Sequence, residues 1–158
     1  MGNQTSEHEH IDSQTGTITI EVSPGELLDR ISILTIKAER FADPARRVSA
    51  QRQLNAYREI KTRALGNLDL THSEQALLEI NRRLWDIEDH LRNRERIKHF
   101  DAEFIELARS VYKSNDHRAA IKKQIDEMFG AAGEGKEYAG QPLVIGEIVA
   151  PVNAIGTR

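Results

Sequence analysis

The stretch that decides the fold is LLEINRRLWDIEDHL, residues 77–91. Its apolar side chains recur at alternating spacings of three and four, the heptad pattern of a helix packed against other helices. They are Leu77, Ile80, Leu84, Ile87 and Leu91. We expect Thr71 or Ser73 to cap this helix and the helix to extend to about Lys98. Such a seam can be buried within one chain or against a second copy, so a homo-oligomer is an expected state.

Two further helices are expected before this one. Ser23-Pro24-Gly25-Glu26 is a helix start, with Ser23 as the cap and Pro24 in the first helical position. The apolar positions that follow have heptad-like spacing and are Leu27, Ile31, Leu34, Ala38 and Phe41. Asp43-Pro44 ends that helix, and the next is expected from Pro44 to about Leu65. Farther upstream, alternating β-branched residues predict a short strand at 17–22.

After residue 98 the pattern predicts a fourth helix capped by Asp101 and a fifth capped by Asn115-Asp116, which ends at Gly130. From residue 131 onward glycine is frequent, which is typical of a loop. The apolar segment 142–149 is either a strand that pairs with 17–22 or a tail that docks on the bundle or on a second subunit. The predicted fold is therefore mainly α: an antiparallel bundle of about five helices with a short N-terminal strand and a loop-rich C-terminal tail.

This pattern divides the chain into three parts. Residues 1–16 are polar and are expected to be a disordered tail, residues 17–130 form a helical domain, and residues 131–158 form a glycine-rich extension. No signal peptide and no membrane-spanning run is recognised, so a cytoplasmic protein is expected.

Composition excludes several classes of function. The 158 residues include no cysteine, which excludes disulfide frameworks and cysteine-based zinc or nucleophile sites. The formal net charge is −3 and aromatic residues make up 5%, so neither a domain-wide basic field nor a stacking platform for nucleic acid is expected. We therefore predict no nucleic-acid partner.

A polar face beside the 77–91 seam is the candidate site. Three carboxylates in four positions, Asp86, Glu88 and Asp89, surround the single tryptophan, Trp85. One interpretation is a solvated helix face held by pairs such as Glu88 with Arg92, and the other is a polar site between helices with Trp85 as its wall. The complete candidate patch for a small anionic ligand is Asn81, Trp85, Asp86, Glu88, Asp89, Arg92, Arg109, Tyr112, Asn115, Asp116, Arg118 and Lys122.

Arg118 stands out in the C-terminal half of this patch. As the predicted cap of a fifth helix, Asp116 has a structural role that needs no ligand. A cation two residues later opposes the helix dipole, so Arg118 needs a partner such as Glu95 or a ligand anion.

No catalytic motif is recognised, and no metal site or cofactor is predicted. The chain lacks a His-Glu-x-x-His helix, a Walker loop and a Gly-x-Ser-x-Gly elbow. Magnesium enters only under an alternative in which Glu88 is joined by Asp29 or Glu26 from another helix.

Several blocks of the chain match a known pattern. They are Ser23-Pro24-Gly25-Glu26-Leu27-Leu28-Asp29-Arg30-Ile31, Asn81-x-x-Leu84-Trp85-Asp86-Ile87-Glu88-Asp89, and shorter blocks from Phe100 to Lys122. Over about residues 20–138 the chain resembles a family of uncharacterised bacterial proteins, a domain of unknown function. The resemblance implies an accessory role near glycosyltransferases and tetratricopeptide proteins in surface-polysaccharide settings. The family's closing Glu-Lys-Ser-Tyr-like signature is matched only loosely by residues 134–138, which leaves any role of Lys136 and Tyr138 open.

Two functional hypotheses follow. The first is a helical binding or accessory module that associates with itself or with a protein partner. The alternative is a magnesium-dependent hydrolase or binding domain for a nucleotide, a sugar nucleotide or a phosphorylated sugar. The alternative requires the charged residues of the patch to meet in one cleft, and the first expects them to pair off over the surface.

Overall fold

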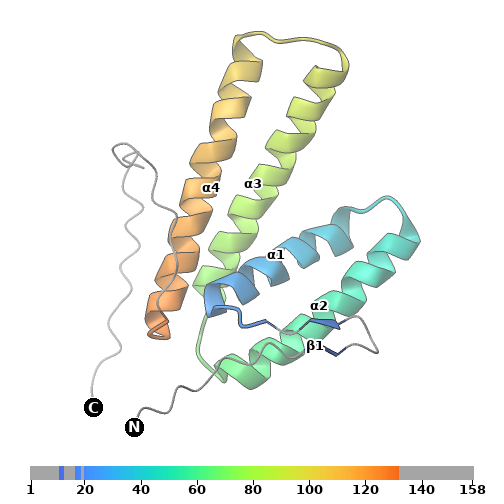
Figure 1. Ribbon diagram of the computed structural model, residues 1–158. Coiled ribbons are helices and arrows are strands. Elements are labelled where there is room, and N and C mark those ends of the chain that lie inside the picture. Colours follow the sequence, from blue (N-terminus) through green and yellow to red (C-terminus); the bar gives the residue numbers. More distant parts are fainter. Residues whose placement is uncertain (1–10, 13–16, 19, 132–158) are drawn as a thin grey trace.

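The computed structural model describes residues 11–12, 17–18 and 20–131 of the chain. Its packed part is all-α and consists of four helices: α1 (Pro24–Arg40), α2 (Pro44–Leu65), α3 (Thr71–Arg96) and α4 (Ala102–Met128). They form two hairpins, α1/α2 and α3/α4, joined by a short connection (Figure 1). None of these four helices has an apolar stretch long enough to cross a lipid bilayer.

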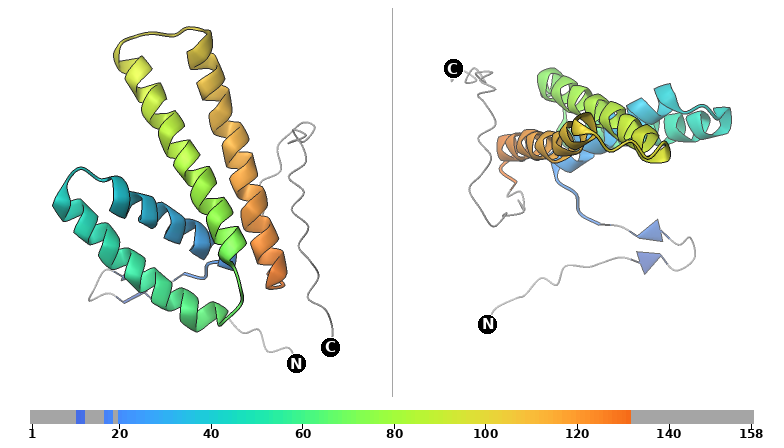
Figure 2. Two further views of the ribbon diagram at one scale, coloured as in Figure 1. Left: turned by 180° about the vertical axis from the view of Figure 1, so that it is seen from behind. Right: turned by 90° about the horizontal axis from the view of Figure 1, so that it is seen from above.

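Helix α1 is the centre of the fold because it packs against each of the other three helices. It crosses the base of the α3/α4 hairpin, whose far half extends beyond α1 and α2 (Figures 1 and 2). We call this far half, residues 87–113, the α3/α4 arm.

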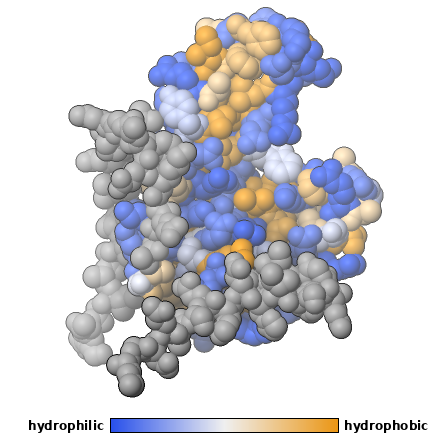
Figure 3. Space-filling view, viewed as in Figure 1, coloured by the Kyte–Doolittle hydropathy of each residue, from blue (hydrophilic) through white to orange (hydrophobic). Residues whose placement is uncertain are grey.

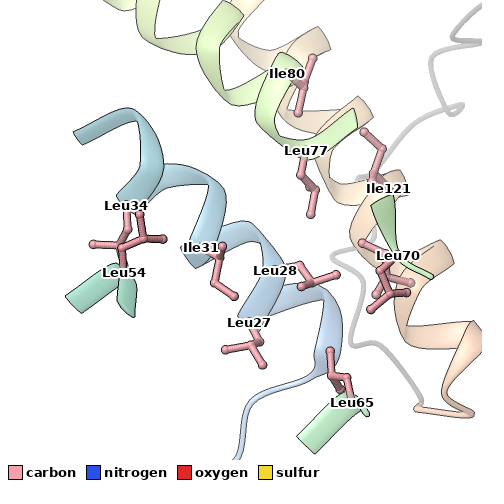
Figure 4. Close-up of a cluster of buried hydrophobic side chains, with 11 residues drawn as sticks. Leu27, Leu28, Ile31, Leu34, Leu54, Leu65, Leu70, Leu77, Ile80 and Ile121 are labelled. Carbon is pink, nitrogen blue, oxygen red and sulfur yellow. The ribbon is translucent and has the colours of Figure 1, made fainter. Parts of the chain in front are cut away.

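The hydrophobic core lies where the four helices meet. Leu28 of α1, Leu77 of α3 and Ile125 of α4 are almost completely buried, and Leu54 and Leu65 bring in α2 (Figure 4). Burying a side chain of this size contributes roughly 1.5–3 kcal/mol, so this shared cluster joins the two hairpins into one unit. The seam predicted at 77–91 supplies Leu77 and Ile80 to the cluster, as expected for its role in packing.

Helices α1 and α2 begin as predicted. The Ser23 Oγ accepts a hydrogen bond from the Glu26 amide at 3.2 Å, with Pro24 in the first helical position. The Asp43 side chain likewise accepts from the amide of Ala45. The first four amides of a helix have no partner inside it, so these oxygens fix where each helix begins.

Both ends of α3 differ slightly from the prediction. Neither Thr71 nor Ser73 caps it: the N-cap is Leu70, which offers no side-chain oxygen, and the Asp69 carboxylate accepts from the Thr71 amide instead. The helix ends at Arg96 rather than near Lys98, because Lys98 adopts a left-handed backbone with φ +56°. This turn lets the His99 amide bond back to the Arg94 carbonyl and closes the helix.

The prediction of five helices is wrong, because the expected fourth and fifth helices are one continuous helix, α4. Asp101 caps it as predicted, with its carboxylate accepting from the Phe104 amide at 3.0 Å. However, Asn115 and Asp116 lie inside the helix and cap nothing. No proline or glycine occurs between 102 and 128, and Asn or Asp in a helix interior costs only a fraction of a kcal/mol. Packing of Ile121 and Ile125 against the core outweighs that cost.

The strand predicted at 17–22 is reduced to Thr17–Ile18 (β2), which pairs antiparallel with Ile11–Asp12 (β1). Neither of these two-residue segments contacts a described helix, so they add nothing to the packed core. The remaining residues of the predicted tail at 1–16, almost all of the extension at 131–158, and the segment at 142–149 lie outside the described residues.

Candidate functional site

A buried polar network occupies the junction of α1, α3 and α4. At its centre is Asn81 of α3, only 5% exposed. Its Nδ2 donates to the Asp29 carboxylate at 2.8 Å and to the Ser32 Oγ at 2.7 Å, both on α1. Its Oδ1 accepts from the Arg118 guanidinium of α4 at 3.2 Å. One amide side chain therefore ties together three helices from separate parts of the sequence.

The residues of the network are placed by helical periodicity. Asp29 and Ser32 are three residues apart on α1, next to the buried Leu28 and Ile31, so both are carried into the interior with the apolar face. The Ser32 hydroxyl also donates to the Asp29 carbonyl at 2.7 Å. Buried polar atoms are costly unless they are hydrogen-bonded, and in the described part of the chain no buried side-chain nitrogen or oxygen lacks a partner.

A second polar contact joins α1 to α4 one turn away. The Lys122 ammonium donates to the Glu26 carboxylate at 2.5 Å, and Arg30 contacts the other oxygen of Glu26 at 3.0 Å. The hydrogen bond from Lys122 is the main reason that the pKa of Glu26 is lowered; partial burial opposes it, and Arg30 assists it. Glu26 is therefore ionised at neutral pH.

A third contact lies at the start of α1. The Gly25 amide donates to the Asp126 carboxylate at 2.6 Å, and Asp126 is buried. A Cβ added at Gly25 would lie 2.5 Å from the Lys122 carbonyl oxygen, closer than atoms can approach. Glycine is therefore needed here by the close approach of α1 to α4.

Three of the twelve predicted site residues take part in these contacts: Asn81, Arg118 and Lys122. The partner predicted for Arg118 is Glu95 or a ligand anion, on the reasoning that Arg118 stands near a helix start. That reasoning is wrong, and Glu95 pairs with Lys98 instead. Arg118 lies in the interior of α4, not at a helix start, and its partner is the Asn81 carbonyl.

Trp85 and Asp86 lie about one turn farther along α3, against the end of α1. The Trp85 ring is 6.2 Å from the Phe41 ring, and Asp86 forms an ion pair with Arg40. Together with the pair between Arg82 and Glu39, these contacts fasten the tip of the α1/α2 hairpin to the middle of α3.

The other candidates are spread along the α3/α4 hairpin. Glu88 pairs with Arg92 of its own helix at 3.4 Å, and Asp89 is exposed. Arg109 pairs with Glu106, and Tyr112 is 43% exposed. Asn115 and Asp116 are half-buried within α4. Glu88 and Arg109 thus pair within their own helices, whereas Asp86 and Lys122 pair with residues of α1. The structure does not bring the charged residues of the predicted patch together in one cleft.

The patch omitted Gly25, Glu26, Asp29, Ser32 and Asp126. The signal for two of them is present in the sequence. Asp29 and Ser32 lie beside apolar positions of the first heptad-like seam, so they are expected on the buried side of the helix and not on its solvated face. The sequence suggests a role for Glu26 and Asp29 only as partners of Glu88 in a magnesium site. Within the described residues, no three His, Asp or Glu side chains are grouped so that they could hold a metal ion.

Comparison with known proteins agrees with the resemblance noted above. A family model described as a family of unknown function, DUF6165, matches residues 18–138, about three quarters of the chain. No curated protein and no solved structure matches. The matched range includes all four helices and every residue of the buried network. The chain therefore belongs to the DUF6165 family.

Proposed function

We propose that this chain is a helical binding module that self-associates through the α3/α4 arm. The observation that carries the proposal is the exposure of large apolar side chains on an arm beyond the reach of α1 and α2. Four of them lie there, each between 43% and 57% exposed: Ile97, Phe100, Ile105 and Tyr112. The face seen in Figure 3 carries a column of apolar residues along this free end.

Helix α4 has a second apolar stripe beside the one that faces α3. Its positions, with spacings of three, four, three and four, are Ile105, Ala108, Tyr112, Asn115 and Ala119, of which Asn115 is the one polar member. All except the half-buried Asn115 are exposed. Heptad spacing with small residues between large ones is suited to close packing against another helix.

A second copy of the chain is the occupant that fits this surface. Two antiparallel helices bury only the sides that face one another, and two such hairpins packed together make a four-helix bundle with a shared core. An isologous contact of this kind needs only one self-complementary surface.

In the surface-polysaccharide settings that the family resemblance implies, such a module would act as an accessory protein. The pairing of Glu88 and Arg109 within their own helices, and of Asp86 with Arg40 of α1, favours this hypothesis over a catalytic cleft built from the predicted patch.

Sedimentation velocity over a range of protein concentrations tests the proposal. The full chain should show a dimer that Ile105→Asp shifts to a monomer, because a charge at the interface would be buried without a partner. Val48→Asp is the matched control: Val48 is 59% exposed against 56% for Ile105 but lies on α2. A monomer at every concentration, or equal effects of both substitutions, would contradict the arm as a self-association surface.

A further inference from the structure

A hollow at the other end of the molecule is unrelated to the arm. It has a volume of about 500 Å³ and lies between α1, the C-terminal half of α2 and the first turns of α3. Its apolar lining comes from Leu28, Ile31 and Leu78. The volume is within the range of small-molecule sites, and an apolar floor with a few polar groups is their usual lining.

The charge around this hollow is positive. Helix α2 carries six Lys or Arg and a single acidic residue, Glu59, in a chain whose net charge is −3. Of the two cations that line the hollow, Lys61 is paired with Glu74 at 2.5 Å, and Arg58 has no ion pair among the described residues. An arginine without an anionic partner offers a planar set of donors for a phosphate or carboxylate.

Two of the hydroxyl groups on the walls, those of Thr35 and Thr62, are arranged to accept hydrogen bonds. The Thr35 Oγ1 donates to the Ile31 carbonyl at 2.9 Å, and the Thr62 Oγ1 donates to the Arg58 carbonyl at 3.0 Å. Each hydroxyl has one proton, so these oxygens offer only lone pairs to a ligand. A ligand that uses them must bring its own donors, as the hydroxyls of a sugar do.

We propose that this hollow binds a small phosphorylated sugar, with the phosphate on Arg58 and the sugar hydroxyls donating to Thr35 and Thr62. The apolar floor accommodates the carbon face of the ring. This site is separate from the Asn81 network and from the arm. Ligand binding here can therefore be tested independently of self-association.

Amide-resolved NMR titration of the full chain tests the site with three probes at constant ionic strength: glucose 1-phosphate, glucose and inorganic phosphate. Glucose 1-phosphate should give saturable shifts confined to residues 28–35, 58–62 and 71–78, and should bind more tightly than either fragment. Arg58→Gln should weaken its binding at least about tenfold, the effect of losing a charged hydrogen bond.

Two matched variants sharpen this test. Arg52→Gln removes a cation from the same helix away from the hollow and should leave binding unchanged. Thr62→Val keeps the shape of the side chain but removes a hydrogen-bond acceptor. It should therefore weaken the binding of glucose 1-phosphate and leave the binding of inorganic phosphate unchanged. The proposal is overturned if millimolar glucose 1-phosphate gives no saturable shift, or if Arg52→Gln and Arg58→Gln weaken binding equally. It is also overturned if only a long polyanion such as heparin binds, across α2 as a whole.

Discussion

Gly25 and Asp126 are joined by a hydrogen bond of 2.6 Å from backbone amide to carboxylate, although 101 residues of sequence separate them. The Gly25 amide is one of the first four of α1, which have no partner within their own helix. A carboxylate from the end of α4 thus completes the start of α1, and Ser23 supplies the neighbouring cap. Negative charge at a helix start is also favourable for the helix dipole.

Replacement of Gly25 by alanine should destabilise the fold by about 2–4 kcal/mol, although alanine is the better helix former. The added methyl would lie 2.5 Å from the Lys122 carbonyl, and a helix backbone cannot yield locally. Urea unfolding followed by circular dichroism measures the change. Gly66→Ala is a comparison that tests backbone strain alone: Gly66 has φ +64° and ψ −144°, a conformation essentially confined to glycine, but nothing lies within 4 Å of an added Cβ. Its loss of free energy of unfolding should be about 1–3 kcal/mol. A Gly25→Ala loss below about 1 kcal/mol would contradict the close approach of α1 and α4.

Asn81→Leu should lower the free energy of unfolding by about 2–4 kcal/mol. It removes the donor of two buried hydrogen bonds and leaves the Asp29 carboxylate without that partner in a dry environment. Asn55→Leu is the comparison, because Asn55 also has a side-chain hydrogen bond, with Gln51 at 2.9 Å, but is exposed. This variant should lower the free energy of unfolding by about 0.5 kcal/mol or less. Similar losses at both positions would show that the network adds no stability.

The contact between Lys122 and Glu26 predicts a pH dependence of stability. The pKa of Glu26 is lowered in the folded protein, so its contribution is complete above the ordinary glutamate value, about 4.3, and is lost as the pH falls through the lowered pKa. Lys122→Met should therefore destabilise the folded protein at pH 7. The difference in stability between this variant and the unsubstituted protein should shrink below about pH 4.

Thermal unfolding from pH 2 to pH 8 measures this difference. Lys123→Met serves as the control, because Lys123 is the next residue along α4 and reaches Glu127 only at 3.9 Å between exposed side chains. Its effect should be small at every pH. A Lys122→Met difference that did not change with pH would locate the effect in packing and not in charge.

Leu84→Asp should destabilise by about 3–5 kcal/mol, because Leu84 is buried in the 77–91 seam and a carboxylate there would have no partner. Val48→Asp, at an exposed apolar position of α2, should change the free energy of unfolding by about 0.5 kcal/mol or less. Chemical denaturation of both variants, compared at equal protein concentration, checks the assignment of the buried seam.

Much of the fold follows from local patterns. The Ser23 and Asp101 caps, the end of α2 at Leu65 and the seam through Leu84 each depend on residues within one or two turns of each other. The helix break predicted at Asn115-Asp116 is wrong, because packing between helices outweighs the local preference there. Those residues disfavour a helix interior only weakly, and packing of Ile121 and Ile125 in the shared core keeps α4 continuous.

The candidate site was less predictable. A helical repeat shows that Asn81 and Trp85 lie close together on α3, but it does not reveal which neighbour each one meets. Asn81 faces α1 and α4 and is buried, whereas Trp85 faces Phe41 at the hairpin tip. The difference depends on the angle at which α1 crosses α3, which no short sequence pattern encodes.

The sequence by itself determined the helical class, the positions of most helix ends, the apolar seam at 77–91 and membership of the DUF6165 family. These features depend on periodicity and capping, which act over a few residues. Only the tertiary structure decided that Gly25 meets Asp126, that Asn81 meets Asp29 and Arg118, and that Arg58 lies beside a hollow without an ion pair to any described residue. These contacts depend on how the two hairpins cross, because packing of the shared core sets the crossing and brings together residues far apart in the chain.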